Sequence, residues 1–98
     1  MMMLGGTSEA KPAILEIQEI ADKVRPLLEE KTNEKYEKFE AVEYKSQIVA
    51  GQNYFIKVDV GHGRFLHIRL FQGISEEDDW ELDDYQVNKT KNDELTYF

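Results

Sequence analysis

The first regular pattern of apolar positions along the chain is helical. Between Ala13 and Lys31, apolar side chains recur at spacings of three and four residues, which predicts an amphipathic helix with one buried face. Pro12 suits the start of this helix, and Thr32-Asn33 suits its end. Pro26 should kink the helix or leave one backbone hydrogen bond unmade. The predicted stripe consists of Ile14, Ile17, Ala21, Val24 and Leu28, widened by Ile20 and Leu27.

After the helix the apolar period changes to two, which is the period of strands. Strands are expected over residues 53–60 and 65–71, joined as a hairpin by the turn Gly61-His62-Gly63-Arg64. Residues 39–48 alternate less cleanly, and residues 80–87 supply a further short strand. The apolar face of the two central strands carries Tyr54, Ile56, Val58, Val60, Leu66, Ile68 and Leu70.

These elements predict an α+β domain in which a single long helix packs across an antiparallel sheet of about five strands. Glu and Lys at alternate positions indicate that one face of the sheet meets water while the other meets the helix. Residues 1–11 lack periodicity and contain Gly5-Gly6, so they are expected to form a flexible N-terminal arm. The length of 98 residues suits one domain, spanning 1–98.

Composition narrows the function. The formal net charge of −8 argues against nucleic acid as a partner, because phosphate binding needs a basic face. There is no cysteine, hence no disulfide, thiolate metal site or thiol nucleophile, which suits a reducing compartment. We see no signal peptide and no stretch of membrane-spanning length, so we expect a cytoplasmic protein without a membrane partner.

Candidate chemistry is sparse. His62 and His67 lie five residues apart across a hairpin turn without a third ligand at a useful spacing, so we interpret both as surface histidines and expect no metal and no cofactor. Residues 76–84 hold seven carboxylates and no basic residue, but lack the spacing of a calcium loop. With no catalytic motif in view, we expect that the protein is not an enzyme.

One short stretch breaks the usual rule that loop tips are polar. Gln47-Ile48-Val49-Ala50-Gly51 lies between two alternating runs and is small and apolar. From the residues alone, it is either an ordinary strand end with a glycine turn or a tip intended for burial in a partner. Val49 and Ala50 would gain from burial in a narrow cleft, and Gly51 permits backbone conformations that a side chain forbids.

This stretch resembles the Gln-x-Val-x-Gly loop of the cystatins, inhibitors of papain-like cysteine proteases. The helix segment 16–24, the run 53–58, the tail 93–98 and the early Gly5 also resemble the stefins, the small cystatins without disulfides, and most of all the stefin A branch. The likeness extends over essentially the whole chain. One departure lies in the second loop, where many stefins have Leu-Pro and this chain has Gly73-Ile74-Ser75-Glu76.

The resemblance implies a wedge that enters the active-site cleft of proteases such as the cathepsins and inhibits them reversibly, competitively and without a covalent bond. Gln47 would satisfy polar groups at the cleft rim. We expect a monomer. The alternative is a non-inhibitory interaction or scaffold protein of the same fold, as a domain-swapped dimer or an engineered binder. The implied protease-binding residues are Met3, Leu4, Gly5 and Gly6 in the arm, Gln47, Ile48, Val49, Ala50 and Gly51 in the tip, and Gly73, Ile74 and Ser75 in the second loop.

Overall fold

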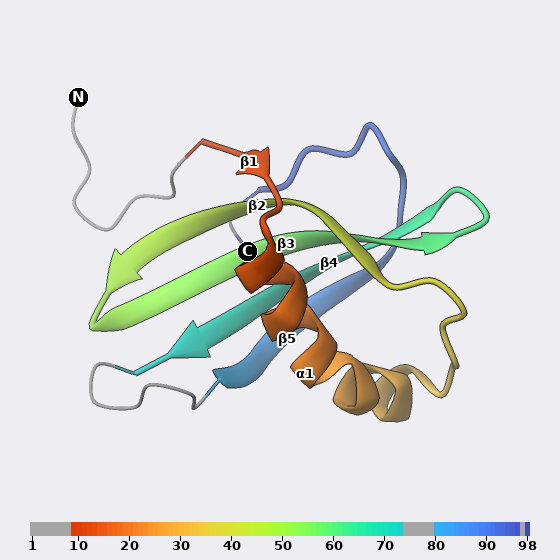
Figure 1. Cartoon of the computed structure of the whole chain (residues 1–98), viewed down its shortest axis with the longest axis horizontal. Coiled ribbons are helices and arrows are strands. Elements are labelled where there is room, and N and C mark those ends of the chain that lie inside the picture. Colours follow the sequence, from red (N-terminus) through yellow and green to blue (C-terminus); the bar gives the residue numbers. More distant parts are fainter. Residues whose placement is uncertain (1–8, 74–79, 97) are drawn as a thin grey trace.

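The computed structural model describes residues 9–73, 80–96 and 98. One helix crosses one face of a five-stranded antiparallel sheet in which the strands follow their sequence order, β1-β2-β3-β4-β5 (Figure 1). The predicted fold class is therefore confirmed. The elements are β1 (Lys11–Pro12), α1 (Leu15–Thr32), β2 (Glu40–Val49), β3 (Gly51–Gly61), β4 (Arg64–Gln72) and β5 (Trp80–Lys89).

The helix α1 begins two residues later than the apolar pattern predicted. Pro12 lies in β1, where it pairs with Glu43 of β2, and Ile14 caps the helix without a side-chain bond. Ile14 was predicted to belong to the buried stripe, but it is 50% exposed, so this part of the prediction is wrong. The helix ends as predicted: Asn33 adopts a left-handed conformation with φ 58°, which closes the last turn. Pro26 lies exposed inside a helix that continues on both sides of it.

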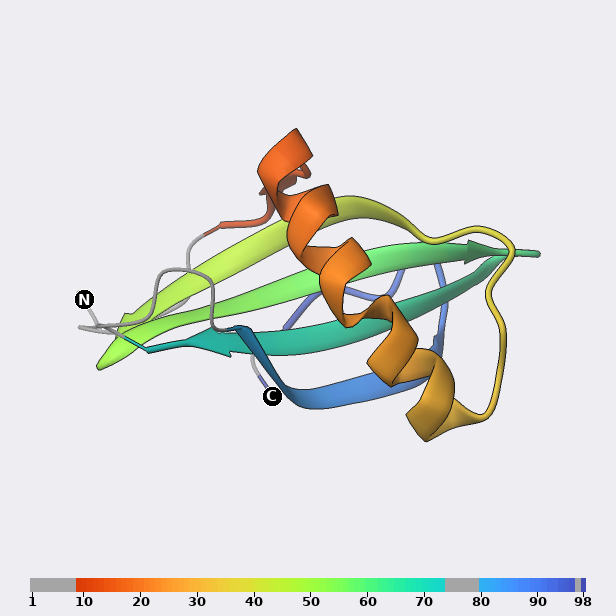
Figure 2. The same ribbon diagram turned by 60° about the horizontal axis from the view of Figure 1, so that its bottom comes forward.

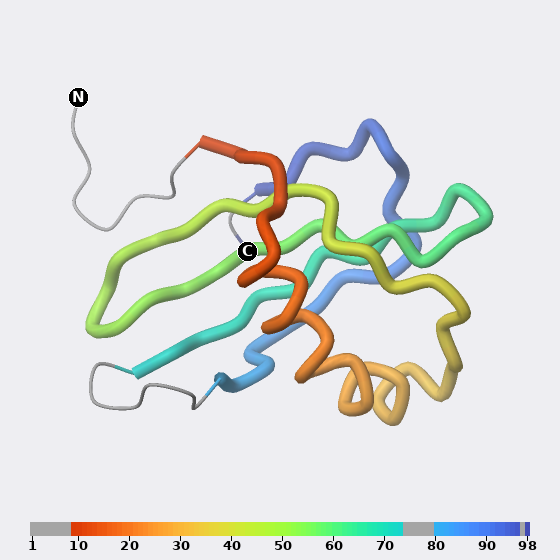
Figure 3. The backbone as a smooth tube through the Cα atoms, in the orientation of Figure 1, coloured from red at the N-terminus to blue at the C-terminus, as the bar shows by residue number. Residues whose placement is uncertain are grey.

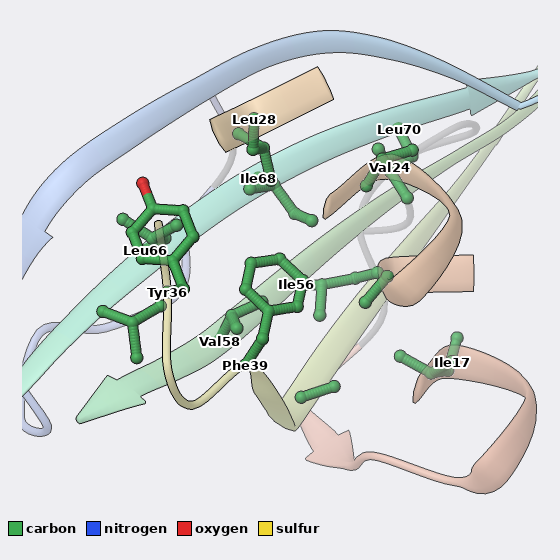
Figure 4. Packing of buried hydrophobic residues seen from close by; sticks show 13 residues of the cluster. Ile17, Val24, Leu28, Tyr36, Phe39, Ile56, Val58, Leu66, Ile68 and Leu70 are labelled. Carbon is green, nitrogen blue, oxygen red and sulfur yellow. The ribbon is translucent and has the colours of Figure 1, made fainter. Parts of the chain in front are cut away.

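The main core fills the space between α1 and the sheet. Figure 4 shows apolar side chains of the helix facing those of β3 and β4, with Tyr36 and Phe39 from the connecting segment closing one end. These two rings lie 5.7 Å apart. The predicted apolar faces of β3 and β4 are thus the observed ones, and so is the helix stripe except for Ile14 and Leu27, which is 40% exposed. The aliphatic residues labelled in Figure 4 are Ile17, Val24, Leu28, Ile56, Val58, Leu66, Ile68 and Leu70.

The second face of the sheet was expected to meet water, but this prediction is wrong: the C-terminal segment after β5 lies against that face. Figure 2 shows α1 on one side of the sheet and the end of the chain on the other. The ring of Phe98 meets that of Phe55 edge-on at 5.7 Å, and Leu95 is 1% exposed. Lys57 is also buried, and its Nζ donates to the carbonyl oxygen of Lys91 at 3.1 Å.

A bulge explains the poor alternation of the first long strand. Ala41 lies opposite Val58, but the next paired residue, Glu43, lies opposite Lys57, so Val42 is an extra residue in β2. Its carbonyl oxygen accepts a hydrogen bond from Ala13 at 3.1 Å. The bulge shifts the side-chain phase of β2 and lets the short β1 join the sheet edge.

Candidate functional site

The turn between β2 and β3 is a narrow apolar tip at one end of the molecule. The two strands stay in register up to Val49 and Gly51, which lie opposite each other with Ala50 between them. Ile48 is 67% exposed and Val49 is 42% exposed, although both are large apolar residues. Figure 3 shows the backbone turning back sharply at this point, at the same end of the molecule as the end of β4. A regular ladder therefore holds exposed apolar side chains in place.

Gly51 is required by both conformation and space. Its φ of +115° is a conformation that side chains rarely adopt. A Cβ atom placed there would lie 2.3 Å from the carbonyl oxygen of Gln72 and 3.2 Å from Cα of Gly73. The end of β4 thus supports the tip from one side, in backbone contact with it.

Gln47 was expected to reach polar groups at the rim of a partner's cleft, but in this structure it is buried within the hairpin. Its side chain is only 6% exposed, and its Oε1 accepts a hydrogen bond from Nδ2 of Asn53 at 2.9 Å. The two residues are register partners across the hairpin. In the free protein, Gln47 therefore stabilises the base of the tip. Asn53, which sequence reasoning did not single out for the site, could have been found from this cross-strand position.

A shallow hollow lies beside the tip. Of the predicted residues, the structure brings Ile48, Val49, Gly51 and Gly73 together around it. Gln52 and Gln72, which face each other in register, complete the described lining and were not predicted. The other predicted residues, Met3, Leu4, Gly5, Gly6, Ile74 and Ser75, lie outside the described residues.

The two histidines differ in environment. His62 is exposed in the β3–β4 turn, as predicted, but His67 of β4 is fully buried beneath the C-terminal segment, so its prediction as a surface residue is wrong. Neither ring nitrogen of His67 has a hydrogen-bond partner among the described residues. Burial, and then the charges of Lys57 and Lys89, lower the pKa of His67 to about 4, against the opposing influence of Asp93 and Glu43.

Comparison with known proteins identifies the class to which this fold and tip belong. The model of the Cystatin domain matches residues 5–92, and the chain belongs to the cystatin family. Within the part of the chain that the structure describes, no helix has the length and apolar character needed to span a membrane.

Individual relatives match over nearly their whole length. Stefin-3 of Mus musculus is 75% identical over 94% of this chain and 89% of its own. Leukocyte cysteine proteinase inhibitor 1 of Sus scrofa is 60% identical over 99% of this chain and 95% of its own. Cystatin-A of Homo sapiens is 57% identical over 99% of this chain and the whole of its own. The resemblance to stefins and to the cystatin A branch is confirmed.

Proposed function

We propose that this chain is a reversible, competitive, non-covalent inhibitor of papain-like cysteine proteases such as cathepsins, and not an enzyme. The observation that carries the proposal is the tip Ile48–Gly51, where large apolar side chains remain exposed on a regular hairpin. A relative from Sus scrofa is itself named as a cysteine proteinase inhibitor. We place the activity in the cytoplasm, since a chain without cysteine needs no oxidising compartment.

The tip would gain affinity by leaving water. Burying apolar surface contributes roughly 25 cal/mol per Å², and Ile48 and Val49 offer such surface at one end of the molecule. Docking costs little conformational entropy here, because the β2–β3 ladder and the end of β4 already hold the tip. A tip seated in the cleft would exclude substrate, which makes the inhibition competitive.

Two further segments complete the proposed contact. Gly73 shares the hollow beside the tip, so the second loop that it begins, with Ile74 and Ser75, would meet the protease next to the tip. In the arm, Met3 and Leu4 would fill adjoining substrate pockets, and Gly5 would let the chain bend away from the catalytic sulfur. An arm with two adjacent glycines loses freedom on docking, so we expect it to adjust selectivity while the tip supplies the common affinity.

Substituting Val49 with Asp tests the proposal. In a papain assay with a fluorogenic peptide substrate, we expect Val49→Asp to raise the inhibition constant on the order of 100-fold or more, because it places an unpaired charge in the cleft. The matched control is Val87→Asp. Val87 is 40% exposed, nearly the same as Val49 at 42%, but it lies in β5.

The control should inhibit papain as the unmodified chain does. Equal inhibition by both variants would contradict a role for the tip. Inhibition that excess substrate does not relieve would contradict the competitive mode. If the unmodified chain leaves papain fully active, the proposed function itself is wrong.

A further inference from the structure

A second hollow lies between the first half of α1 and the sheet, and the tip does not explain it. Its floor is formed by Tyr54 of β3 and Trp80 of β5, and one wall by α1 residues that include Glu16 and Glu19. Gln72 lines both this groove and the hollow beside the tip, so the two hollows are neighbours. We call it the helix groove.

The two aromatic rings that line the helix groove, those of Tyr54 and Trp80, are held by the core, and Tyr44 supports Tyr54 from outside the groove. The rings of Tyr54 and Trp80 lie 5.1 Å apart at an angle of 34°, and Tyr44 meets Tyr54 edge-on at 6.1 Å. All three pack against the main core but are only partly buried. Aromatic faces that are rigid and partly exposed can bind cations through their quadrupoles.

The wall of the groove carries negative charge. Glu16, Glu19 and Asp22 contribute three carboxylates, against the single ammonium of Lys23 in the described lining. Asp22 accepts a hydrogen bond from Gln18, whereas Glu16 and Glu19 have no ion pair among the described residues. The pKa of Tyr54 is raised by burial, then by Tyr44 and then by Glu16, which indicates that the Glu16 carboxylate lies near the aromatic floor.

We propose that the helix groove binds a basic peptide segment of a partner protein, with an Arg or Lys side chain over the Tyr54–Trp80 rings and its charge facing Glu16 and Glu19. Charge complementarity selects this occupant: an anionic or purely apolar segment would meet the acidic wall of a chain whose net charge is −8. The proposal is independent of protease inhibition, because none of its contacts uses the tip.

Trp80 makes the test direct, since it is the only tryptophan of the chain. The full chain would be titrated at low salt with a short peptide of alternating arginine and serine, while tryptophan fluorescence is followed. The matched probe replaces each arginine by citrulline, which keeps the shape but removes the charge. We expect a saturable change with the arginine peptide and binding at least about tenfold weaker with the citrulline peptide.

Variants separate the helix groove from a general attraction to an acidic protein. Glu16→Gln/Glu19→Gln should weaken binding about three- to tenfold. Glu30→Gln/Glu37→Gln removes the same charge from exposed positions outside the groove and should change affinity less than about twofold. Thermal unfolding monitored by circular dichroism would verify that each variant is folded.

Three outcomes would overturn the proposal. They are equal losses in the two pairs of variants, an unchanged Trp80 signal at saturating peptide, and a loss of binding in Glu76→Gln/Glu77→Gln but not in Glu16→Gln/Glu19→Gln. The last result would assign the basic peptide to the acidic run that precedes Trp80 in the sequence.

Discussion

Gly51 shows how a single residue connects the fold to the proposed site. The tip can turn within one residue because Gly51 adopts a φ of +115°, and β4 can support it because no side chain separates the two backbones. The turn residue Gly63 also has positive φ, at +73°, but nothing lies within 4 Å of a Cβ placed there. A side chain at Gly63 would therefore meet only backbone strain, whereas a side chain at Gly51 would meet both strain and a steric clash.

We predict that Gly51→Ala lowers the free energy of unfolding more than Gly63→Ala does. Strain costs about 1 kcal/mol or somewhat more at Gly63, whose φ is near the left-handed region, and more at Gly51, whose φ lies further from it; the clash with the Gln72 carbonyl oxygen adds to the strain only at Gly51. Urea denaturation of both variants would measure the difference. Gly51→Ala should also weaken papain inhibition, whereas Gly63→Ala should not. Equal losses of stability would contradict the close backbone contact seen here.

His67 is the residue with the largest consequence for pH dependence. It is fully buried among cations and anions from four segments: Lys57 of β3, Glu43 of β2, Lys89 of β5 and Asp93 of the C-terminal segment. Its folded pKa is lowered from 6.5 to about 4, so between these pH values the unfolded chain binds a proton that the folded chain does not. Stability must therefore fall as the pH falls from 6.5, and this loss ends below about 4.

We predict that the free energy of unfolding falls by roughly 2–3 kcal/mol across this window. Denaturation at a series of pH values would measure it, and nuclear magnetic resonance would follow the ring of His67 directly. His67→Leu should remove most of the slope between pH 4.5 and 6.5, whatever its effect on overall stability. His62→Asn is the control: His62 is exposed at φ 57°, which Asn tolerates, so the slope should persist.

Carboxylates add their own losses at lower pH. The main-chain N–H of Tyr36 bonds Glu29 and lowers the pKa of that carboxyl below its ordinary 4.5. Its contribution to stability is lost as the pH falls through that lowered pKa. A slope confined to the region below pH 4.5 would thus belong to carboxylates and would contradict the role assigned to His67.

At the scale of elements, the C-terminal segment acts as the second cover of the sheet. Its described residues form no helix or strand, yet Leu95 is buried and the ring of Phe98 lies against Phe55 on the face opposite α1. The guanidinium of Arg69 donates to an oxygen of Phe98 and lies 5.8 Å from the centre of its ring, which fixes the end of the chain. The sheet that presents the tip is thus packed on both faces.

We predict that Leu95→Ala destabilises the fold by about 2–4 kcal/mol, because Leu95 is 1% exposed and truncating its side chain leaves a cavity in its place. Leu15→Ala makes the same chemical change at a position that is 73% exposed and should cost less than about 0.5 kcal/mol. Guanidinium denaturation of the two variants gives the comparison. Similar small costs would show that the segment does not pack as described.

Periodicity predicted the elements that bury a stripe or a face, and failed where a contact is not periodic. The faces of α1, β3 and β4 follow from spacings of three, four and two residues. The pair Lys11–Pro12 is too short to show a period, and the bulge at Val42 interrupts one. Leu95 shows no apolar period with its neighbours, so the sequence pattern did not indicate that it would be buried.

At the scale of the whole molecule, the proposed site depends on segments that are distant in sequence. The apolar tip was apparent in the sequence because it broke the polar pattern of loops. Its contact with the end of β4 depends on strand order and register, which bring Gln72 opposite Gln52 and next to Gly51. A single sequence cannot supply that β3–β4 register. The pairing of Gln47 with Asn53 is different, because both residues lie three positions from Ala50 in one hairpin, but the prediction placed Gln47 at the cleft rim instead.

The same architecture leads to a prediction about oligomers. If the turn at Ala50 opened, β2 and β3 could continue as one long strand, and two chains could exchange α1 and β2 while keeping their core contacts. Such a domain-swapped dimer would lose the turn that projects Ile48 and Val49. We therefore expect a dimer formed by partial unfolding and refolding to leave papain active, while the monomer binds it one to one.

Gel filtration after such treatment would separate the two forms for titration against papain. As a control, the isolated dimer would be unfolded in guanidinium and refolded at high dilution, where separate chains are favoured, and papain binding should return in full. A dimer that inhibits as well as the monomer, chain for chain, would contradict the prediction, because the tip would then be intact. It would also show that the exchange, if any occurs, uses a hinge other than the turn at Ala50.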